Sequence, residues 1–299
     1  MWRRAIARRS FFSLSAAVTL AYMSLLLFMP LAAGVLAALQ LEPAEFWRIV
    51  AHPRVLSAYR VIFLCSGLAA IVNGLIGLVV AWVLVRYEFV GKRLLDALVD
   101  LPLALPTAVA GLTFASLYSP TGWLGQHLTA LEPDGCIGRI FAADGVIGRF
   151  FGGWDIRLHD GALAIVVVLL FVGFPFVVRA VQPVLAELEP EQEEAAASLG
   201  ASRGQTFRYV ILPYILPAWL TGMALAFARG LGEYGAVVFV ASNLPYRTEI
   251  PAVLVVASLE QFQIAEAAVV ALGMMLLAFM SLLAIQLLER WSRRHEANI

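Results

Sequence analysis

Charged side chains are scarce in this chain, and lysine is almost absent. Only 14% of the 299 residues are charged, whereas a soluble domain usually has about 25%. Lys92 is the single lysine among 21 basic residues. A nucleotide-binding P-loop has the pattern G-x-x-x-x-G-K-[ST], because its lysine must reach the phosphates. Here Gly91 and Lys92 are followed by Arg93, and Arg86 stands where the first glycine should be. The sequence therefore excludes a standard ATPase site in this chain.

Cysteine and histidine are too few and too scattered to suggest a metal site or a disulfide framework. The two cysteines, Cys65 and Cys136, fall in an apolar stretch and in a polar loop. The four histidines show no spacing of the H-E-x-x-H kind. A G-x-S-x-G motif and a catalytic dyad are also missing, which argues against a membrane-embedded enzyme. The net charge is zero, so nothing favours nucleic acid as a partner. We expect no catalytic residue, no metal ligand and no cofactor bound by the chain itself.

Long apolar runs are what the chain does have. It is 61% hydrophobic, and about 20 consecutive apolar residues can cross a bilayer as a helix. We therefore predict an all-α, polytopic membrane protein with six transmembrane helices and a helical cytoplasmic loop. The predicted spans are Leu14–Leu39, Tyr59–Val85, Leu94–Ser119, Gly161–Val181, Ile215–Ala241 and Ala265–Leu288. Prolines are expected to bend the third and fourth spans, because they remove backbone donors.

Basic residues are unevenly divided between the two sides of the predicted membrane. With the N-terminus inside, the cytoplasmic segments contain thirteen basic residues and the outer segments seven, although the longest loop is outside. By the positive-inside rule, both termini are expected in the cytoplasm. The apolar run after Arg8-Arg9 is too long for the core of a cleavable signal, so we expect the first helix to be retained.

These features divide the chain into parts. We expect cytoplasmic tails at residues 1–13 and 289–299. Residues 14–58 would be a first helix with its outer loop, and residues 59–288 the main transmembrane domain. The main domain contains an outer loop at 120–160 and a cytoplasmic loop at 182–213. No internal repeat and no separate soluble domain is apparent in the sequence.

A short polar helix is predicted inside the cytoplasmic loop. Pro190 suits a first helical position, because its missing N–H would be unpaired there anyway. Glu191, Glu193 and Glu194 follow, where acidic groups favour the positive end of the helix dipole. Gly200 can end the helix in a left-handed conformation.

A second helix is predicted directly after the first. Ser202 and Gln205 form a capping-box pattern that begins it, and it must bend or end near Pro213. Two short helices in this arrangement form a hairpin outside the membrane. Such a hairpin is suited to docking on another protein.

The hairpin also resembles a known sequence motif. Glu194, Ala195 and Ala196 are followed by Gly200 and, further on, by Leu212-Pro213. This E-A-A-x-x-x-G pattern with a later Leu-Pro resembles the cytoplasmic loop of binding-protein-dependent ABC importer permeases. The resemblance implies that these residues seat a coupling helix in a cleft of an ATPase subunit.

Charged residues inside a predicted span are costly, which makes each of them a functional candidate. Arg229 and Glu233 lie four residues apart on one face of the fifth span, and Asp100 of the third span could approach them. In one interpretation Arg229 attracts an anion and the carboxylates define a gate. In the other, Arg229 and Glu233 neutralise each other and pin the bundle.

Three glycines, Gly230, Gly232 and Gly235, fall within seven residues of the fifth span. Small residues let helix backbones approach closely, and they can also loosen a helix into a hinge. Both interpretations remain open at this point.

Three blocks in colinear order resemble the sulfate/thiosulfate importer permeases of the CysT type. They are Leu101–Thr113, Pro175–Leu185 and Gly232–Phe239, within a similarity that runs from about Pro53 to Trp291. The candidate pathway or gate residues lie in or beside these blocks: Asp100, Pro102, Pro106, Thr107, Arg229, Gly232 and Glu233.

The resemblance implies a permease subunit of an ATP-driven importer in the bacterial inner membrane. Residues 59–288 would be a type I ABC transmembrane domain that moves sulfate, and thiosulfate, by alternating access. The implied partners are a homologous W-type permease, two ATPase subunits that hold ATP and Mg²⁺, a periplasmic sulfate-binding protein and membrane lipid. Two alternatives remain: the same machine for molybdate or tungstate, and an ion-gradient-driven carrier that uses Asp100, Arg229 and Glu233 as a relay.

Overall fold

The structure is a computed structural model that describes residues 14–127 and 161–296. All regular structure in these two ranges is helical, as predicted. Five helices within them are long and apolar enough to cross a membrane: Leu14–Ala38, Pro53–Arg86, Ala162–Glu187, Arg203–Leu231 and Ile264–Leu287. Most of the predicted outer loop, with Cys136, and the whole of the predicted N-terminal tail, residues 1–13, lie outside the described residues.

The chain divides into two compact units. The first contains the N-terminal residues through His52 together with Leu254–Gly273, and the second contains Pro53–Val253 and the residues from Met274 onward. The helices of the first unit before His52 are η1 (Ser24–Phe28), α2 (Met29–Ala38) and α3 (Pro43–Val50). Two helices pass from one unit to the other, α15 (Pro251–Glu260) and α16 (Ile264–Glu296). Residues 289–296, predicted as part of a tail, therefore prolong the last helix.

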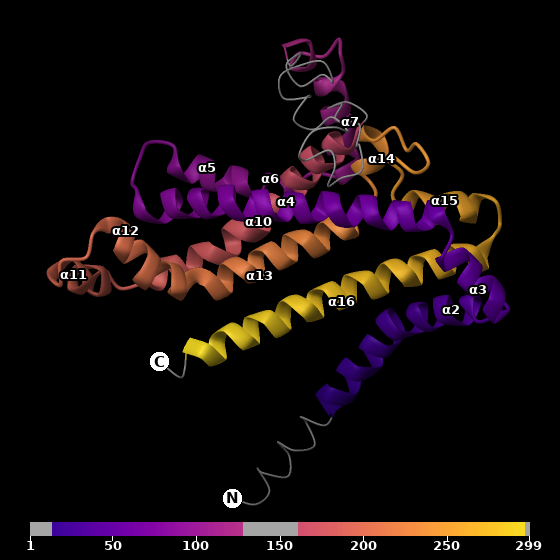
Figure 1. The fold of residues 1–299 in the computed structure, drawn as a ribbon, viewed down its shortest axis with the longest axis horizontal. Helices are drawn as coiled ribbons and strands as arrows, with labels where there is room; N and C mark the ends of the chain where they lie inside the picture. Colours follow the sequence, from indigo (N-terminus) through magenta and orange to yellow (C-terminus); the bar gives the residue numbers. More distant parts are fainter. Residues whose placement is uncertain (1–13, 128–160, 297–299) are drawn as a thin grey trace, which may run out of the picture. The chain divides into compact units, whose positions relative to one another are not determined.

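Three long helices form the core of the second unit: α4 (Pro53–Arg86), α10 (Ala162–Glu187) and α13 (Leu212–Leu231) pack against one another (Figure 1). Glycine allows the close approach, since a Cβ on Gly77 would lie 2.9 Å from the Cβ of Val177. Polar bonds add to this packing. Asn73 Nδ2 donates to the carbonyl of Leu170 at 3.0 Å, and Trp219 Nε1 donates to that of Gly74 at 2.8 Å.

The third predicted span is broken into three pieces: α5 (Lys92–Val99), α6 (Leu101–Ala104) and α7 (Thr107–Tyr118), the last followed by the short η2 (Gly125–His127). The bend expected there is therefore a full interruption. Leu105 is extended, with φ −82° and ψ 135°, because a residue before proline avoids the helical region. Pro106 then begins a new helix. By contrast, α10 continues as a helix through Pro175 and Pro183.

The fifth predicted span also differs from the structure, because its helix ends at Leu231 instead of Ala241. The side chain of Glu233 accepts a hydrogen bond from the N–H of Ala236 at 2.9 Å. Such a local bond offers the backbone an alternative to the helix. After this turn comes the one-turn helix α14 (Val237–Val240), which packs against α7.

Candidate functional site

The hairpin between α10 and α13 has the caps that its sequence predicts. Its first helix, α11 (Pro190–Ser198), begins with Pro190. Gly200 follows the end of the helix with φ +85°. The N–H of Gly200 bonds to the carbonyl of Ala197 at 2.9 Å, and that of Ala201 to Ala196 at 3.0 Å. This pair of bonds is the Schellman motif, which needs a left-handed residue at that position. The predicted helix end is confirmed.

The second helix of the hairpin begins with the predicted capping box. Gln205 Oε1 accepts from the N–H of Ser202 at 2.8 Å, and Ser202 Oγ accepts from the N–H of Gln205 at 3.4 Å. The helix α12 (Arg203–Thr206) then passes through a π-helical turn, η4 (Phe207–Ile211), into α13. The turn lies immediately before Leu212-Pro213, where the sequence predicted a bend or an end. Such turns accommodate a missing backbone donor within a helix.

The surface of the hairpin is open. None of the residues of α11 is buried, and Glu194 and Ala195 are exposed. At the tip, Leu199 is 90% exposed, and Tyr209 on the second helix is 71% exposed. A nine-residue helix without a buried face gains little from packing on its own chain. The sequence interpretation overlooked Leu199, although a large apolar residue beside a capping glycine was a visible signal.

An arginine cluster joins α10 to α5 and α6, and the sequence interpretation missed it. Arg179 donates to both oxygens of Asp100 at 2.8 and 2.6 Å, to Oδ1 of Asp96 at 2.7 Å, to the Asp96 carbonyl at 2.8 Å and to Oε1 of Gln182 at 2.6 Å. All five guanidinium donors are therefore used. Arg179 was not singled out from the sequence, although the four-residue spacing of Asp96 and Asp100 was a signal for a shared partner.

The sequence left open an approach of Asp100 to Arg229 and Glu233, and in the structure Asp100 is bound by Arg179 instead. Because Arg179 holds it in a bidentate pair, Asp100 belongs to a separate cluster. Asp96, which lies outside the five long apolar helices, also accepts from Gln182 Nε2 at 3.1 Å.

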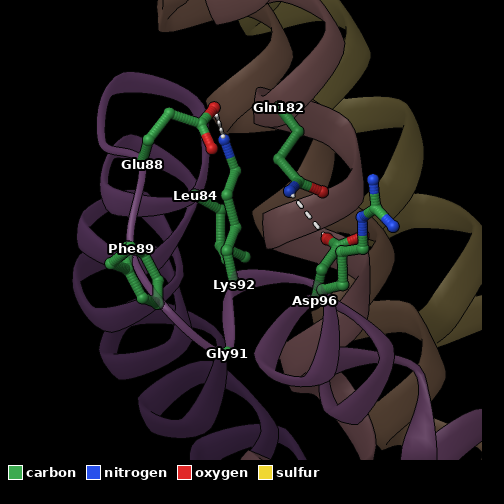
Figure 2. A pocket seen from close by; sticks show the side chains of 8 residues that line it. Leu84, Glu88, Phe89, Gly91, Lys92, Asp96 and Gln182 are labelled. Carbon is green, nitrogen blue, oxygen red and sulfur yellow. Dashed lines mark hydrogen bonds and ion pairs between the residues drawn. The ribbon is translucent and has the colours of Figure 1, made fainter.

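A cavity of about 540 Å³ lies beside the cluster. Figure 2 shows Asp96 and Gln182 on one wall and the ion pair of Lys92 with Glu88, at 2.7 Å, on the other. Its charged lining residues are of both signs. Because Asp96 is bonded to Gln182 and Lys92 to Glu88, the cavity does not present a set of free ligands.

Arg229 and Glu233 form the ion pair that their spacing predicted. Arg229 Nη1 lies 2.6 Å from Glu233 Oε2. The side chain of Glu233 is 2% exposed, while that of Arg229 is 34% exposed. The pair therefore neutralises a buried carboxylate, as the second of the two interpretations proposed, and part of the Arg229 side chain remains accessible. Whether that part meets an anion is a question of function.

The glycines at the end of α13 and in the turn after it differ in how closely other atoms pack around them. A Cβ on Gly235 would collide with Thr107 Oγ1, and one on Gly230 would lie 2.9 Å from Ser66 Oγ. Both positions are therefore close-packed. For Gly232, which caps α13, the described parts of the chain place one atom within 4 Å of such a Cβ, the carbonyl oxygen of Arg229 at 4.0 Å. The contact with Gly235 therefore places Thr107 at the turn after Gly232, whereas Pro102 is buried in α6.

A further ion pair between residues far apart in the sequence lies at the N-terminal end of α4. Arg54 binds both carboxylate oxygens of Glu249 at 2.7 Å each, and Ser57 Oγ donates to the carbonyl of Tyr246 at 3.0 Å. These bonds fasten the chain between α14 and α15 to α4. The sequence interpretation did not single out either residue. Among the described residues, no group of three or more histidine, cysteine, aspartate or glutamate side chains is placed to hold a metal ion.

Known proteins are similar to this chain in sequence over most of its length. The chain is 43% identical to the sulfate transport system permease protein CysT of Salmonella typhimurium over 284 residues, which cover 95% of this chain and 94% of that protein. It is 44% identical to CysT of Synechocystis over 278 residues, covering 93% and 89%. It is 42% identical to CysT of Escherichia coli over 284 residues, covering 95% and 94%.

Solved structures share the fold at lower identity. One is a bacterial ABC transporter involved in the import of the acidic polysaccharide alginate, with a TM-score of 0.72, 15% identity and coverage of 96% of this chain and 97% of that one. Another is a bacterial alginate ABC transporter in complex with a pentasaccharide-bound periplasmic protein, with a TM-score of 0.71, 14% identity and coverage of 94% of each chain. Residues 73–294 match the family model described as "Binding-protein-dependent transport system inner membrane component". By this match and by the identities above, the chain belongs to the family of binding-protein-dependent transport system inner membrane components.

Proposed function

We propose that this chain is the permease subunit of an ATP-driven importer that moves sulfate, and also thiosulfate, across the bacterial inner membrane. One observation carries the proposal: 42 to 44% identity over 93 to 95% of the chain to three proteins named sulfate transport system permease protein CysT. The match is distributed over the whole chain, so it includes both the membrane helices and the exposed hairpin.

In this proposal ATP is hydrolysed by a separate subunit. The chain has no P-loop lysine, and α11 is a capped helix with no buried residue. Two ATPase subunits, with their ATP and Mg²⁺, would dock on this hairpin and on that of a homologous W-type permease. On α11 the contact surface would be Glu194, Ala195 and Ala196. Gly200 would set the turn at the tip, and Leu212-Pro213 would lead into the membrane.

The anion pathway is proposed at the turn between α13 and α14. Arg229 is partly exposed there and could attract a dianion, while Glu233 and Thr107 would line a gate beside the free hinge position Gly232. Contacts to the anion must be weak, because a pathway must release what it admits. Selectivity would then reside mainly in a periplasmic sulfate-binding protein. Asp100 would act in the Arg179 cluster, away from this gate.

In an alternating-access cycle, movement of the hairpin would be coupled to opening of the gate at the turn between α13 and α14. Closure of the ATPase subunits would displace α11, tilt the helices that continue from the hairpin, and open the gate to the outside. The proposed orientation places both termini and the hairpin in the cytoplasm, as the distribution of basic residues favours.

The test is uptake of labelled sulfate in bacterial cells that lack their own sulfate importer. This chain would be supplied with the candidate partner permease, ATPase and binding protein, with and without excess molybdate. We expect uptake that requires the ATPase and is indifferent to molybdate. ATPase-dependent uptake of molybdate without sulfate would change the substrate. Uptake that persists without the ATPase would contradict the proposal and favour an ion-driven carrier.

A further inference from the structure

Glu193 connects the hairpin helix α11 directly to α4. Its carboxylate forms an ion pair with Arg86, the last residue of α4. The side chains of Arg86 and Glu193 are 23% and 30% exposed, so the pair is largely shielded from solvent. Such shielding strengthens a charge pair compared with an exposed one. The remaining acidic residues of α11 are exposed.

Arg86 also contacts the second half of the hairpin through an aromatic pair. Its guanidinium carbon lies 5.3 Å from the centroid of the Trp82 ring, one helical turn earlier. The Trp82 ring meets the Phe207 ring edge-on, with centroids 5.8 Å apart, and Phe207 begins the π-helical turn. Arg86 therefore contacts α11 directly, through its ion pair with Glu193. It contacts the π-helical turn indirectly, through the Trp82 ring that packs against Phe207.

One donor of the Arg86 guanidinium, the buried Nε, has no hydrogen-bond partner among the residues that the structure describes. A buried donor without a partner is unfavourable and requires an explanation. The guanidinium is held instead by a carboxylate and by an aromatic face, which an arginine can engage at the same time.

We propose that Arg86, with Trp82 and Glu193, is the strut through which displacement of the hairpin moves α4. The inference rests on the proposed function, because it takes α11 as the helix that docks on the ATPase. Without the strut, α11 is joined to the bundle through its neighbours in the chain, and it could move while α4 stays in place. With it, a displacement of α11 acts on the end of α4, which packs along α10 and α13. Arg86 is thus a positioning residue for the coupling of ATP hydrolysis to transport.

The test uses Arg86→Gln, Glu193→Gln and the double variant in the complete transporter, reconstituted in lipid vesicles. Glu193→Gln is the milder change, because it leaves Arg86 on the Trp82 ring. The first measurement is hydrogen exchange of the α11 amides without nucleotide or sulfate. The second is the number of ATP molecules hydrolysed for each sulfate ion imported. Glu88→Gln is the matched control, since it makes the same change in an exposed ion pair near the same end of α4.

We expect each single variant to speed exchange in α11 and to raise the ATP-to-sulfate ratio on the order of threefold, while the double variant is no worse than either single one. The control should behave like the unchanged protein. The strut would be overturned if hydrogen exchange of the α11 amides were unchanged in Glu193→Gln, or if the ATP-to-sulfate ratio were unchanged. It would also be overturned if the effects of the two single variants multiplied in the double variant. Absence of sulfate import by the unchanged transporter would count against the proposed function alone, because the exchange measurement needs neither sulfate nor ATP.

Discussion

Two arginines on neighbouring helices of the bundle show how differently the same side chain is used. Arg179 has all five donors bound within the protein. Arg229 is bound to one carboxylate and remains partly exposed. The two side chains are exposed to a similar extent, 33% for Arg179 and 34% for Arg229, so the difference lies in their donors: a guanidinium whose five donors are all bound has none left for a passing anion. At the scale of residues, Arg179 is therefore a fastening between helices, and Arg229 is the better candidate for contact with substrate.

Replacing Arg179 by lysine should weaken the attachment of α5 and α6 to α10. Lysine keeps the charge but offers three donors from one atom, and it cannot reproduce the planar bidentate pair with Asp100. At least two hydrogen bonds are lost, each worth about 1 kcal/mol or more because the partners are charged. We expect Arg179→Lys to unfold in detergent at a lower temperature than the unchanged protein and to show reduced transport.

The matched control for this change is Arg48→Lys. Arg48 forms an exposed pair with Glu45 within α3, and exposed pairs contribute little to stability. The control should unfold at the temperature of the unchanged protein. If both variants unfolded at the same temperature, the cluster would not stabilise the helices that it joins.

At the scale of helices, the sequence prediction was accurate where local caps decide a helix end, and it failed where a side chain competes for the backbone or where residues distant in the sequence meet. The ends of α11 and the start of α12 were predicted because their caps are local, within a few residues of Pro190, Gly200 and Ser202. The end of α13 was missed, since the apolar pattern continues to Ala241 while the side chain of Glu233 binds the backbone. The partner of Asp100 was missed because it lies 79 residues away, and no periodic pattern reports such a contact.

Gly200 should be replaceable by asparagine but not by valine. It has φ +85°, a conformation that costs an ordinary side chain roughly 1–2 kcal/mol and a β-branched one more. Asparagine adopts it most readily after glycine. No atom of residues 14–127 or 161–296 lies within 4 Å of a Cβ placed there, so the outcome depends on backbone conformation and not on space. We expect Gly200→Val to abolish ATPase-dependent uptake, and Gly200→Asn to retain most of it at an equal amount of protein in the membrane. Equal uptake by both variants would show that the hairpin tip does not need its left-handed cap.

At the scale of the whole molecule, many large apolar side chains are exposed. Within the part of the chain that the structure describes, the most apolar stretch of Leu14–Ala38 has no buried residue, and only 11% of that of Ile264–Leu287 is buried. Large exposed apolar surfaces mark contact with a membrane or with other subunits. By contrast, 61% of the corresponding stretch of Ala162–Glu187 is buried, so this helix is the centre of its unit. The remaining question at this scale is which end of the bundle faces the cytoplasm.

Two single cysteines should report the orientation. Leu199 is 90% exposed at the hairpin tip, and Leu244, between α14 and α15, is 44% exposed. The background is silent once Cys136→Ser is introduced, because the remaining Cys65 is completely buried. If the basic residues orient the chain as proposed, a membrane-impermeant thiol reagent added outside should label Leu244→Cys and not Leu199→Cys. Inverted vesicles should give the opposite result. Labelling of Leu199→Cys from the outside of sealed cells would place the hairpin away from the cytoplasm. ATP would then be out of reach of any subunit docked on it, and the coupling of α11 to an ATPase would have to be abandoned.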